Sequence, residues 1–236
     1  RRFFENNWLD LSLLGELAYS YHQLGIYRDA MQLYLYLMEM AKPEEKEEYF
    51  LPLTQIAYDM GDFALVQDYA TQYSYHYPHG TFTEEVLYLQ LKSLLAMNQI
   101  DQAINLIPSP LPDRDNYKFL AAELFFRKDS YESVVSVLKP FWVQQVALPE
   151  NLTFILAESL YMLGELFEAE PIFRESSTIK RYAGQSLYRL AEIARKNGDE
   201  PRALSLYAAI AESDNETLWK KFAERELRLS QLSQRL

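Results

Sequence analysis

Residues 71–80 read TQYSYHYPHG and contain two of the chain's three histidines. His76 and His79 lie three residues apart, among Tyr73, Tyr75 and Tyr77. Imidazole groups bind metal ions and transfer protons, and tyrosine hydroxyls can assist in the second task. Whether this stretch does either depends on the elements that carry it.

Those elements repeat along the chain. YHQLGIYRDAMQLY (21–34), YMLGELFEAEPIF (161–173) and ARKNGDEPRALSLY (194–207) share a helical stretch, a glycine, a short polar turn and then a small residue. Weaker copies are found at 57–70, 95–107 and 125–138. The small or β-branched residue five positions after the glycine, or after its replacement, is Ala30, Val66, Ala103, Val134, Ala169 and Ala203. Successive members of this set lie 31 to 37 residues apart.

Six copies with a period near 34 resemble the tetratricopeptide repeat, a helix–turn–helix unit. The resemblance implies an all-α, right-handed superhelical solenoid that forms a single domain over residues 1–236. We expect about six repeats, at residues 11–43, 47–79, 84–110, 115–145, 150–180 and 184–214. The charged and apolar segment 215–236 then forms an amphipathic capping helix with Asn215 as its N-cap. Residues 1–12 are expected to be the remainder of an earlier helix or a cap of their own.

Packing supports this interpretation. When Gly25 is counted as position 15 of its repeat, position 8 is small in five of the six repeats. A large side chain there would push two crossing helices apart. Glycine at position 15 suits a helix end with left-handed backbone, and Asn98 and Asp129 replace it in repeats three and four.

The repeat answers the question raised by the two histidines. Pro78 falls where the family places the proline that ends the second helix, so His76 and His79 lie on either side of a helix end. They are therefore not expected to form a metal site. With no phosphate-binding loop, nucleophile motif or metal-binding helix motif in the sequence, we expect no cofactor and no enzymatic activity.

Prolines interrupt the period at two places. PSPLPDRD (108–115) is expected to shorten the second helix of repeat three, and Pro140 to do the same in repeat four. These repeats are where we expect a change in the solenoid, either simple helix termination or a hinge.

The composition excludes several classes of partner. The formal charge of −11 argues against nucleic acid and against anionic membrane surfaces. The chain has no cysteine, and no apolar run approaches the 18 or so residues of a membrane span. Because it begins with Arg1 rather than Met, we expect a piece of a longer protein.

The family resemblance places a ligand groove at positions 2, 5, 9 and 12 of each first helix. These positions share one helix face. The candidate partner-binding residues are Tyr19, Tyr58, Tyr88, Lys92, Phe119, Glu123, Phe126, Phe154, Glu158, Tyr161, Tyr188, Glu192 and Arg195. Aromatic rings beside a row of three glutamates suit an amphipathic helix or an extended peptide with basic groups. The alternative is that part of this stripe packs as core between repeats.

The Lys and Asn clamp with which some co-chaperone repeats hold acidic C-termini is absent here. Gly15, Glu16 and Tyr19 occupy its positions in repeat one, and Leu51, Pro52 and Gln55 in repeat two. We therefore expect a different protein or peptide partner.

A second resemblance concerns compartment. Residues 77–104 look like the YP-x-S-x-Y…A-x-Y…G-x-x-x-x-A-I pattern of bacterial cell-envelope repeat proteins, such as the outer-membrane assembly lipoprotein and the Tol–Pal coordinator, without the pattern's glycine. It favours the bacterial periplasm or envelope over the cytoplasm. The alternative functions are a carbohydrate-binding or polysaccharide-secretion scaffold and self-association through the ends of the solenoid.

Overall fold

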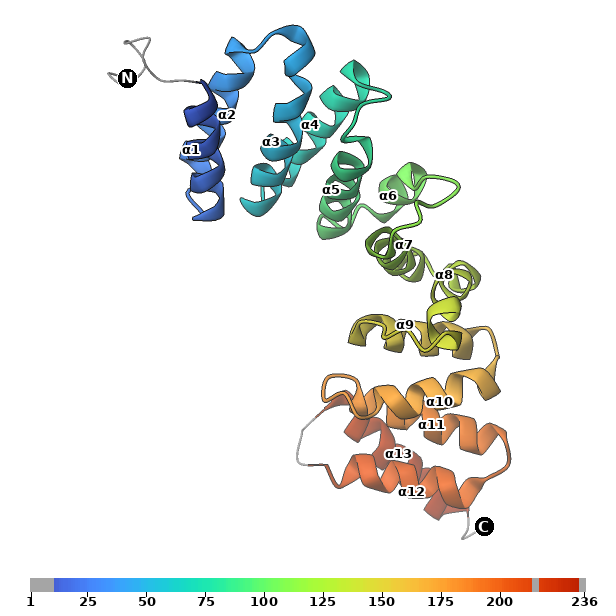
Figure 1. Ribbon diagram of the computed structural model, residues 1–236. Coiled ribbons are helices and arrows are strands. Elements are labelled where there is room, and N and C mark those ends of the chain that lie inside the picture. Colours follow the sequence, from blue (N-terminus) through green and yellow to red (C-terminus); the bar gives the residue numbers. More distant parts are fainter. Residues whose placement is uncertain (1–10, 214–216, 234–236) are drawn as a thin grey trace. The chain divides into compact units, whose positions relative to one another are not determined.

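The computed structural model describes residues 11–213 and 217–233 (Figure 1). These residues form α-helices and one short 3₁₀ helix, and no strand occurs among them. The chain divides into two compact units, residues 1–109 (unit 1) and 110–236 (unit 2). Each unit is described by itself, and the single continuous domain stays a prediction.

Unit 1 consists of three helical hairpins. Its helices are α1 (Leu11–Gln23), α2 (Tyr27–Met40), the 3₁₀ helix η1 (Pro43–Glu45), α3 (Glu47–Asp59), α4 (Phe63–His76), α5 (Thr83–Ala96) and α6 (Ile100–Leu106). The second helix of one hairpin packs on the first helix of the next, as α2 does on α3 and α4 on α5.

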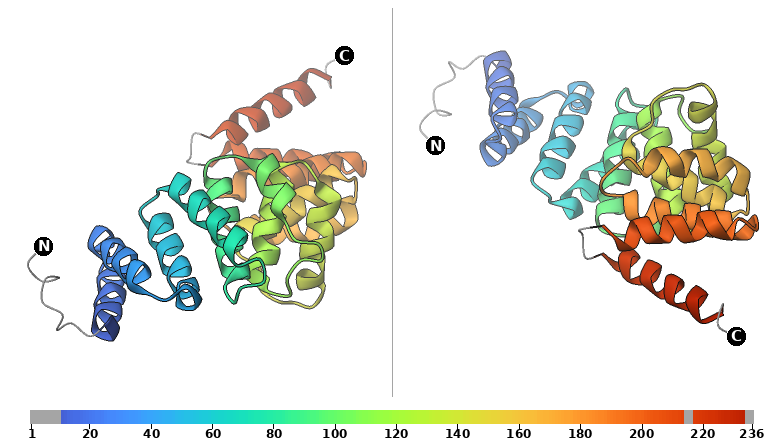
Figure 2. Two further views of the ribbon diagram at one scale, coloured as in Figure 1. Left: turned by 90° about the horizontal axis from the view of Figure 1, so that it is seen from above. Right: turned by 90° about the horizontal axis from the view of Figure 1, so that it is seen from below.

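Unit 2 continues the pattern with three hairpins and a final helix. These are α7 (Asp115–Arg127), α8 (Tyr131–Val143), α9 (Glu150–Met162), α10 (Leu166–Ser176), α11 (Ala183–Lys196), α12 (Glu200–Ala211) and α13 (Leu218–Ser233). Helix α13, drawn in red in Figure 2, packs on α12 and α11.

We call the first helix of each hairpin its A helix and the second its B helix. Neighbouring A helices contact each other within a unit: α3 contacts α5, and α7 contacts α9. The side of a unit formed by its A helices is called its A-helix face. This all-helical repeat architecture confirms the predicted fold class.

The turns confirm the predicted helix ends. Gly25, Gly61, Gly164 and Gly198 have positive φ, as do Asn98 and Asp129 in repeats three and four. Asparagine and aspartate tolerate this left-handed conformation better than other residues with a side chain.

The small residues lie where the helices cross. Position 8 is buried in all six repeats, including repeat three, where Leu91 replaces the small residue. Ala30, Val66, Ala103, Val134, Ala169 and Ala203 have no exposed surface at all. The period in the sequence therefore marks the tightest contacts of each hairpin.

The prolines act differently from one another. Helix α4 ends at His76 just before Pro78, and α6 is only seven residues long, both as predicted. The prediction for Pro140 is wrong, because α8 continues through it to Val143. The proline ring holds a helical φ, so α8 can pass through Pro140, although it lacks the N–H that would bond the Ser136 carbonyl.

Helix α9 is exceptional among the described helices. Every residue from Leu152 to Tyr161 is buried, so the helix has no solvent-facing side over that length. The other helices bury one face, as amphipathic helices at a surface do. Its neighbours α8, α10 and α7 surround it.

The predicted capping helix corresponds to α13. Ala223 is fully buried. The Trp219 side chain packs on Gly184, so that a Cβ atom at this glycine would lie 3.4 Å from it. Its C-terminal half leaves Leu229 and Leu232 exposed. The predicted N-cap Asn215, Leu236 and the segment 1–10 lie outside the described residues.

Candidate functional site

The A-helix face of unit 1 carries an accessible aromatic and cationic cluster. Lys92 on α5 places its Nζ 4.3 Å from the centroid of the Tyr58 ring on α3 and 5.6 Å from that of Tyr88. All three side chains are partly exposed. Among the described residues no carboxylate pairs with Lys92. We call Tyr58, Tyr88 and Lys92 the unit 1 cluster.

A polar group lies beside this cluster. His22 Nε2 is 2.8 Å from Asp59 Oδ2, and the Gln55 amide donates a hydrogen bond to Asp59 Oδ1 at 3.0 Å. The Asp59 carboxylate is therefore occupied by its neighbours. Tyr19, on α1, has 59% of its surface exposed.

In unit 2, the three predicted residues of α7 are partly exposed. The ring centroids of Phe119 and Phe141 are 5.2 Å apart, and those of Phe126 and Tyr131 are 6.1 Å apart. Within the described residues, no cation pairs with Glu123. That Phe119, Glu123 and Phe126 line a ligand groove stays a prediction.

The three predicted residues of α9 are placed differently. Phe154, Glu158 and Tyr161 are only 7%, 6% and 9% exposed. The Phe154 ring stacks on Tyr182 with 4.7 Å between centroids and 7° between planes. These side chains belong to the core, which is the alternative that the sequence leaves open.

The glutamates do not form an unpaired acidic row either. Arg189 on α11 donates from its Nε to Glu158 at 3.0 and 3.1 Å, and its Nη1 bonds Glu192 at 2.7 Å. Tyr161 donates to Glu192 at 3.2 Å. The expected acidic row is thus reduced to Glu123, because an arginine at position 6 neutralises the other two.

The surroundings of Arg189 favour its charged form. Burial by itself lowers the pKa of the Arg189 guanidinium, but hydrogen bonds and charge attraction from Glu158 and Glu192 outweigh it and raise that pKa. Arg189 therefore keeps its charge, and its hydrogen bonds to the two carboxylates are charge-assisted.

Tyr188 and Arg195 lie beneath the capping helix. The Tyr188 ring lies 5.4 Å from Trp219 and 6.1 Å from Phe222 of α13. Burial, followed by the nearby charges of Glu192 and Glu226, raises the Tyr188 pKa. Arg195 pairs with Glu226 at 2.7 Å. These residues hold α13 in place, so their side chains are partly used by the fold.

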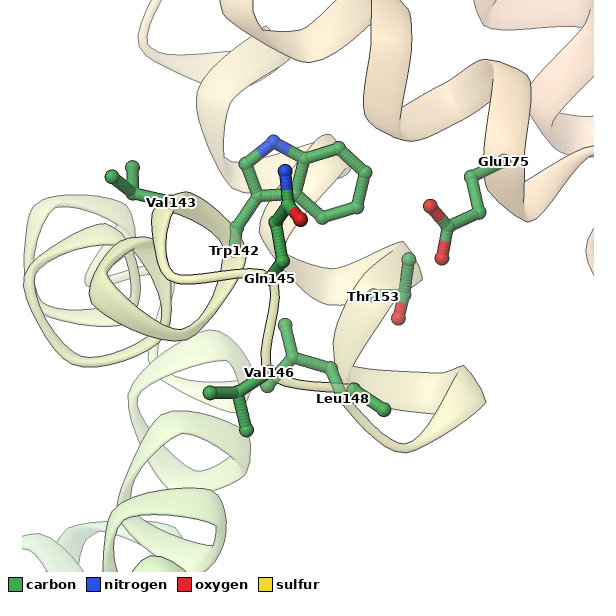
Figure 3. A pocket seen from close by; sticks show the side chains of 8 residues that line it. Trp142, Val143, Gln145, Val146, Leu148, Thr153 and Glu175 are labelled. Carbon is green, nitrogen blue, oxygen red and sulfur yellow. The ribbon is translucent and has the colours of Figure 1, made fainter.

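A pocket of about 650 Å³ opens in unit 2, where α8 ends. Figure 3 shows Trp142 and Gln145 on one side, Val146 and Leu148 below, and Thr153 and Glu175 opposite. Its size is typical of ligand pockets. The sequence signals this region only as the aromatic-containing connector after Pro140. The pocket forms because residues 144–149 leave the helical pattern.

No group of three or more potential metal ligands occurs in the part of the chain that the structure describes. His76 lies at the end of α4 and His79 follows it in a turn, as the sequence predicts. None of the described helices is both long and apolar enough to cross a membrane.

No family model matches the sequence, and no curated protein sequence matches it. Solved structures do resemble the fold. A tetratricopeptide repeat protein from Parabacteroides merdae is 13% identical, with 98% of this chain and 88% of that chain covered and a TM-score of 0.54. MamA from AMB-1 is 15% identical, and the match covers 74% of this chain and 94% of MamA with a TM-score of 0.58.

Yeast Tom70 aligns with 99% of this chain at 15% identity and a TM-score of 0.50, and the match spans 57% of that protein. These similarities, together with the hairpins and their tightly packed small residues, establish that the chain has the tetratricopeptide-repeat fold.

Proposed function

We propose that the chain is a non-catalytic scaffold that binds a polypeptide segment, extended or helical, on the A-helix face of unit 1. The unit 1 cluster carries this proposal. Two partly exposed tyrosines flank an ammonium group that, among the described residues, has no carboxylate partner. Aromatic side chains are frequent anchors of protein interfaces.

The charges of this face favour one kind of segment. Asp59 is occupied by His22 and Gln55, whereas the Lys92 ammonium is available. A segment with an apolar anchor against the exposed parts of the tyrosines and a carbonyl or carboxylate next to Lys92 complements it. This differs from the basic ligand that the glutamate row predicts, because Arg189 neutralises Glu158 and Glu192 of that row.

The same cluster suits a sugar less well. Carbohydrates stack on an open aromatic face, and the Lys92 ammonium lies over the Tyr58 ring. The polypeptide is therefore the favoured ligand class, and a neutral glycan is the alternative that the experiment distinguishes.

The test compares two variants in a pull-down from lysate of the native organism, quantified by mass spectrometry. A Tyr58→Ala, Tyr88→Ala double variant removes the anchors. The matched control is Tyr75→Ala, which truncates a tyrosine 81% exposed on the B helix α4. Circular dichroism first establishes that both remain helical.

We expect one or more proteins to bind wild type and control but not the double variant. Calorimetry with that purified protein should then show at least a tenfold loss of affinity in the double variant. Equal binding to all three chains would overturn the proposal. Retention of the wild type on a neutral polysaccharide, lost in the double variant, would support the glycan instead.

A further inference from the structure

The pocket at the end of α8 is distinct from the unit 1 cluster, so an inference about it goes beyond the proposed function. All eight residues that line it come from the segment 142–175 of unit 2. It is therefore complete within one compact unit.

One side of this pocket is apolar. Trp142 is partly buried against the core, and Val146 and Leu148 lie below it in Figure 3. Val143 and Val146, which also line the pocket, are 68% and 45% exposed. Exposed valines beside a tryptophan are an apolar surface that an apolar side chain of a ligand would cover.

The other side carries a negative charge. Glu175, at the end of α10, directs its carboxylate towards Thr153 and the indole of Trp142 (Figure 3). Within the described residues its side chain has no ion pair or hydrogen bond. The other two carboxylates of α10 are both paired, Glu168 with Lys139 and Glu170 with Arg174 and Arg202.

The backbone at the pocket's rim holds an unusual residue. Gln145 has φ 57°, a conformation that glycine adopts more easily. Its N–H bonds the Trp142 carbonyl and that of Val146 bonds Phe141, which is the turn that commonly ends helices with glycine. The chain thus keeps a strained residue at a position that lines the pocket together with Trp142.

We propose that this pocket binds a lysine or arginine side chain of a partner polypeptide, together with an apolar residue next to it. The cation lies between the Trp142 ring and the Glu175 carboxylate, and the Gln145 amide oxygen accepts a further hydrogen bond. Tryptophan is the best aromatic partner for a cation, and the chain's charge of −11 attracts basic segments.

The probe is the tripeptide leucine–lysine–leucine, acetylated and amidated to remove its terminal charges. The readout is the indole N–H signal of Trp142 in two-dimensional ¹H–¹⁵N spectra. The chain has three tryptophans, so this signal is assigned with Trp142→Phe. Probes with norleucine in place of lysine, and n-butylammonium alone, complete the ligand series.

The protein variants separate charge from fold. Glu175→Gln removes the pocket carboxylate, and Glu165→Gln makes the same change at an exposed residue of the α9–α10 turn that does not line the pocket. Gln145→Gly removes the amide without disfavouring the turn. The Tyr58→Ala, Tyr88→Ala variant reports on the unit 1 cluster.

We expect the lysine probe to shift the Trp142 signal and saturate. Norleucine and Glu175→Gln should each weaken binding about tenfold, and Gln145→Gly a few-fold, with no effect of Glu165→Gln or of the unit 1 variant. Failure of the lysine probe to bind, or equal affinities for lysine and norleucine, would overturn the proposal. So would n-butylammonium binding as tightly as the tripeptide, which would indicate a small-amine site.

Discussion

Arg189 extends from α11 to α9 and pairs with Glu158, a carboxylate only 6% exposed. The same guanidinium reaches Glu192 on its own helix, and its carbon lies 4.5 Å from the centroid of the Tyr161 ring. One side chain therefore joins two neighbouring hairpins of unit 2 and satisfies a charge inside the core.

Replacing Arg189 by alanine should destabilise the protein strongly, because Glu158 would be left buried without a partner. We expect a loss of about 3–5 kcal/mol in the free energy of unfolding, measured by urea denaturation. Arg174→Ala, which removes an exposed partner of Glu170, should cost less than about 1 kcal/mol.

The double change Glu158→Leu, Arg189→Met tests the reason. If the loss comes from the unpaired charge, an apolar pair should restore stability to within about 1 kcal/mol of wild type or exceed it. A double variant as unstable as Arg189→Ala would contradict this explanation.

Gln145→Gly should stabilise unit 2, since glycine relieves the left-handed backbone. The expected gain is about 1 kcal/mol, seen as a higher urea midpoint. Gly164→Ala is the reverse control: its φ is 83° and a methyl group there meets no atom within 4 Å, so any destabilisation reports the backbone alone. A Gln145→Gly protein less stable than wild type would show that the side chain supports the turn.

Tyr207→Phe should be neutral or stabilising at pH 7. The Tyr207 side chain is fully buried, and its hydroxyl has no hydrogen-bond partner among the described residues. Removing an unsatisfied buried hydroxyl recovers up to about 1 kcal/mol. Thermal unfolding of this variant is compared with that of Tyr73→Phe.

Tyr73 is the appropriate contrast because it is equally buried but fully bonded. Its hydroxyl donates to Glu47 at 2.9 Å and accepts from the Phe82 N–H at 2.8 Å. Tyr73→Phe should lose about 1–2 kcal/mol. Equal effects of the two changes would mean that Tyr207 also has a partner in solution.

Stability should decline at alkaline pH. Burial raises the pKa of Tyr207, and burial with the hydrogen bond to Glu47 raises that of Tyr73. The unfolded chain then releases these protons first, near pH 10, so the folded state loses stability as pH rises above that value and not below it.

Urea midpoints measured from pH 8 to pH 11 check this. They should be level up to about pH 9 and fall beyond pH 10, and the fall should be smaller in Tyr207→Phe. A decline of equal size in wild type and Tyr207→Phe would assign it to other groups.

The sequence predicts those features that depend on local spacing. The small residues at position 8, and those five positions after the glycine, mark helix crossings. Asn98 and Asp129 occupy turns with left-handed backbone, which depend on that one residue and so can be predicted locally. Pro78 likewise ends α4 as its position in the repeat implies.

Local spacing does not predict how deeply a side chain is buried or which side chains pair between helices. Periodicity places Phe154, Glu158 and Tyr161 on one helix face, but it does not reveal that neighbouring hairpins cover that face. Arg189 lies 31 residues from Glu158, so their pairing depends on how two repeats stack. The pocket beside Trp142 depends on an irregular connector that follows no repeat at all.

The burial of residues 152–161 of α9 has a consequence for how the protein opens. Its amides exchange with solvent only when the helices around it separate, whereas those of the exposed faces exchange through smaller fluctuations. In deuterium exchange, residues 152–161 should therefore be the last in unit 2 to acquire label. The most deeply buried of the described helices would then be the part of unit 2 that a cellular protease reaches last.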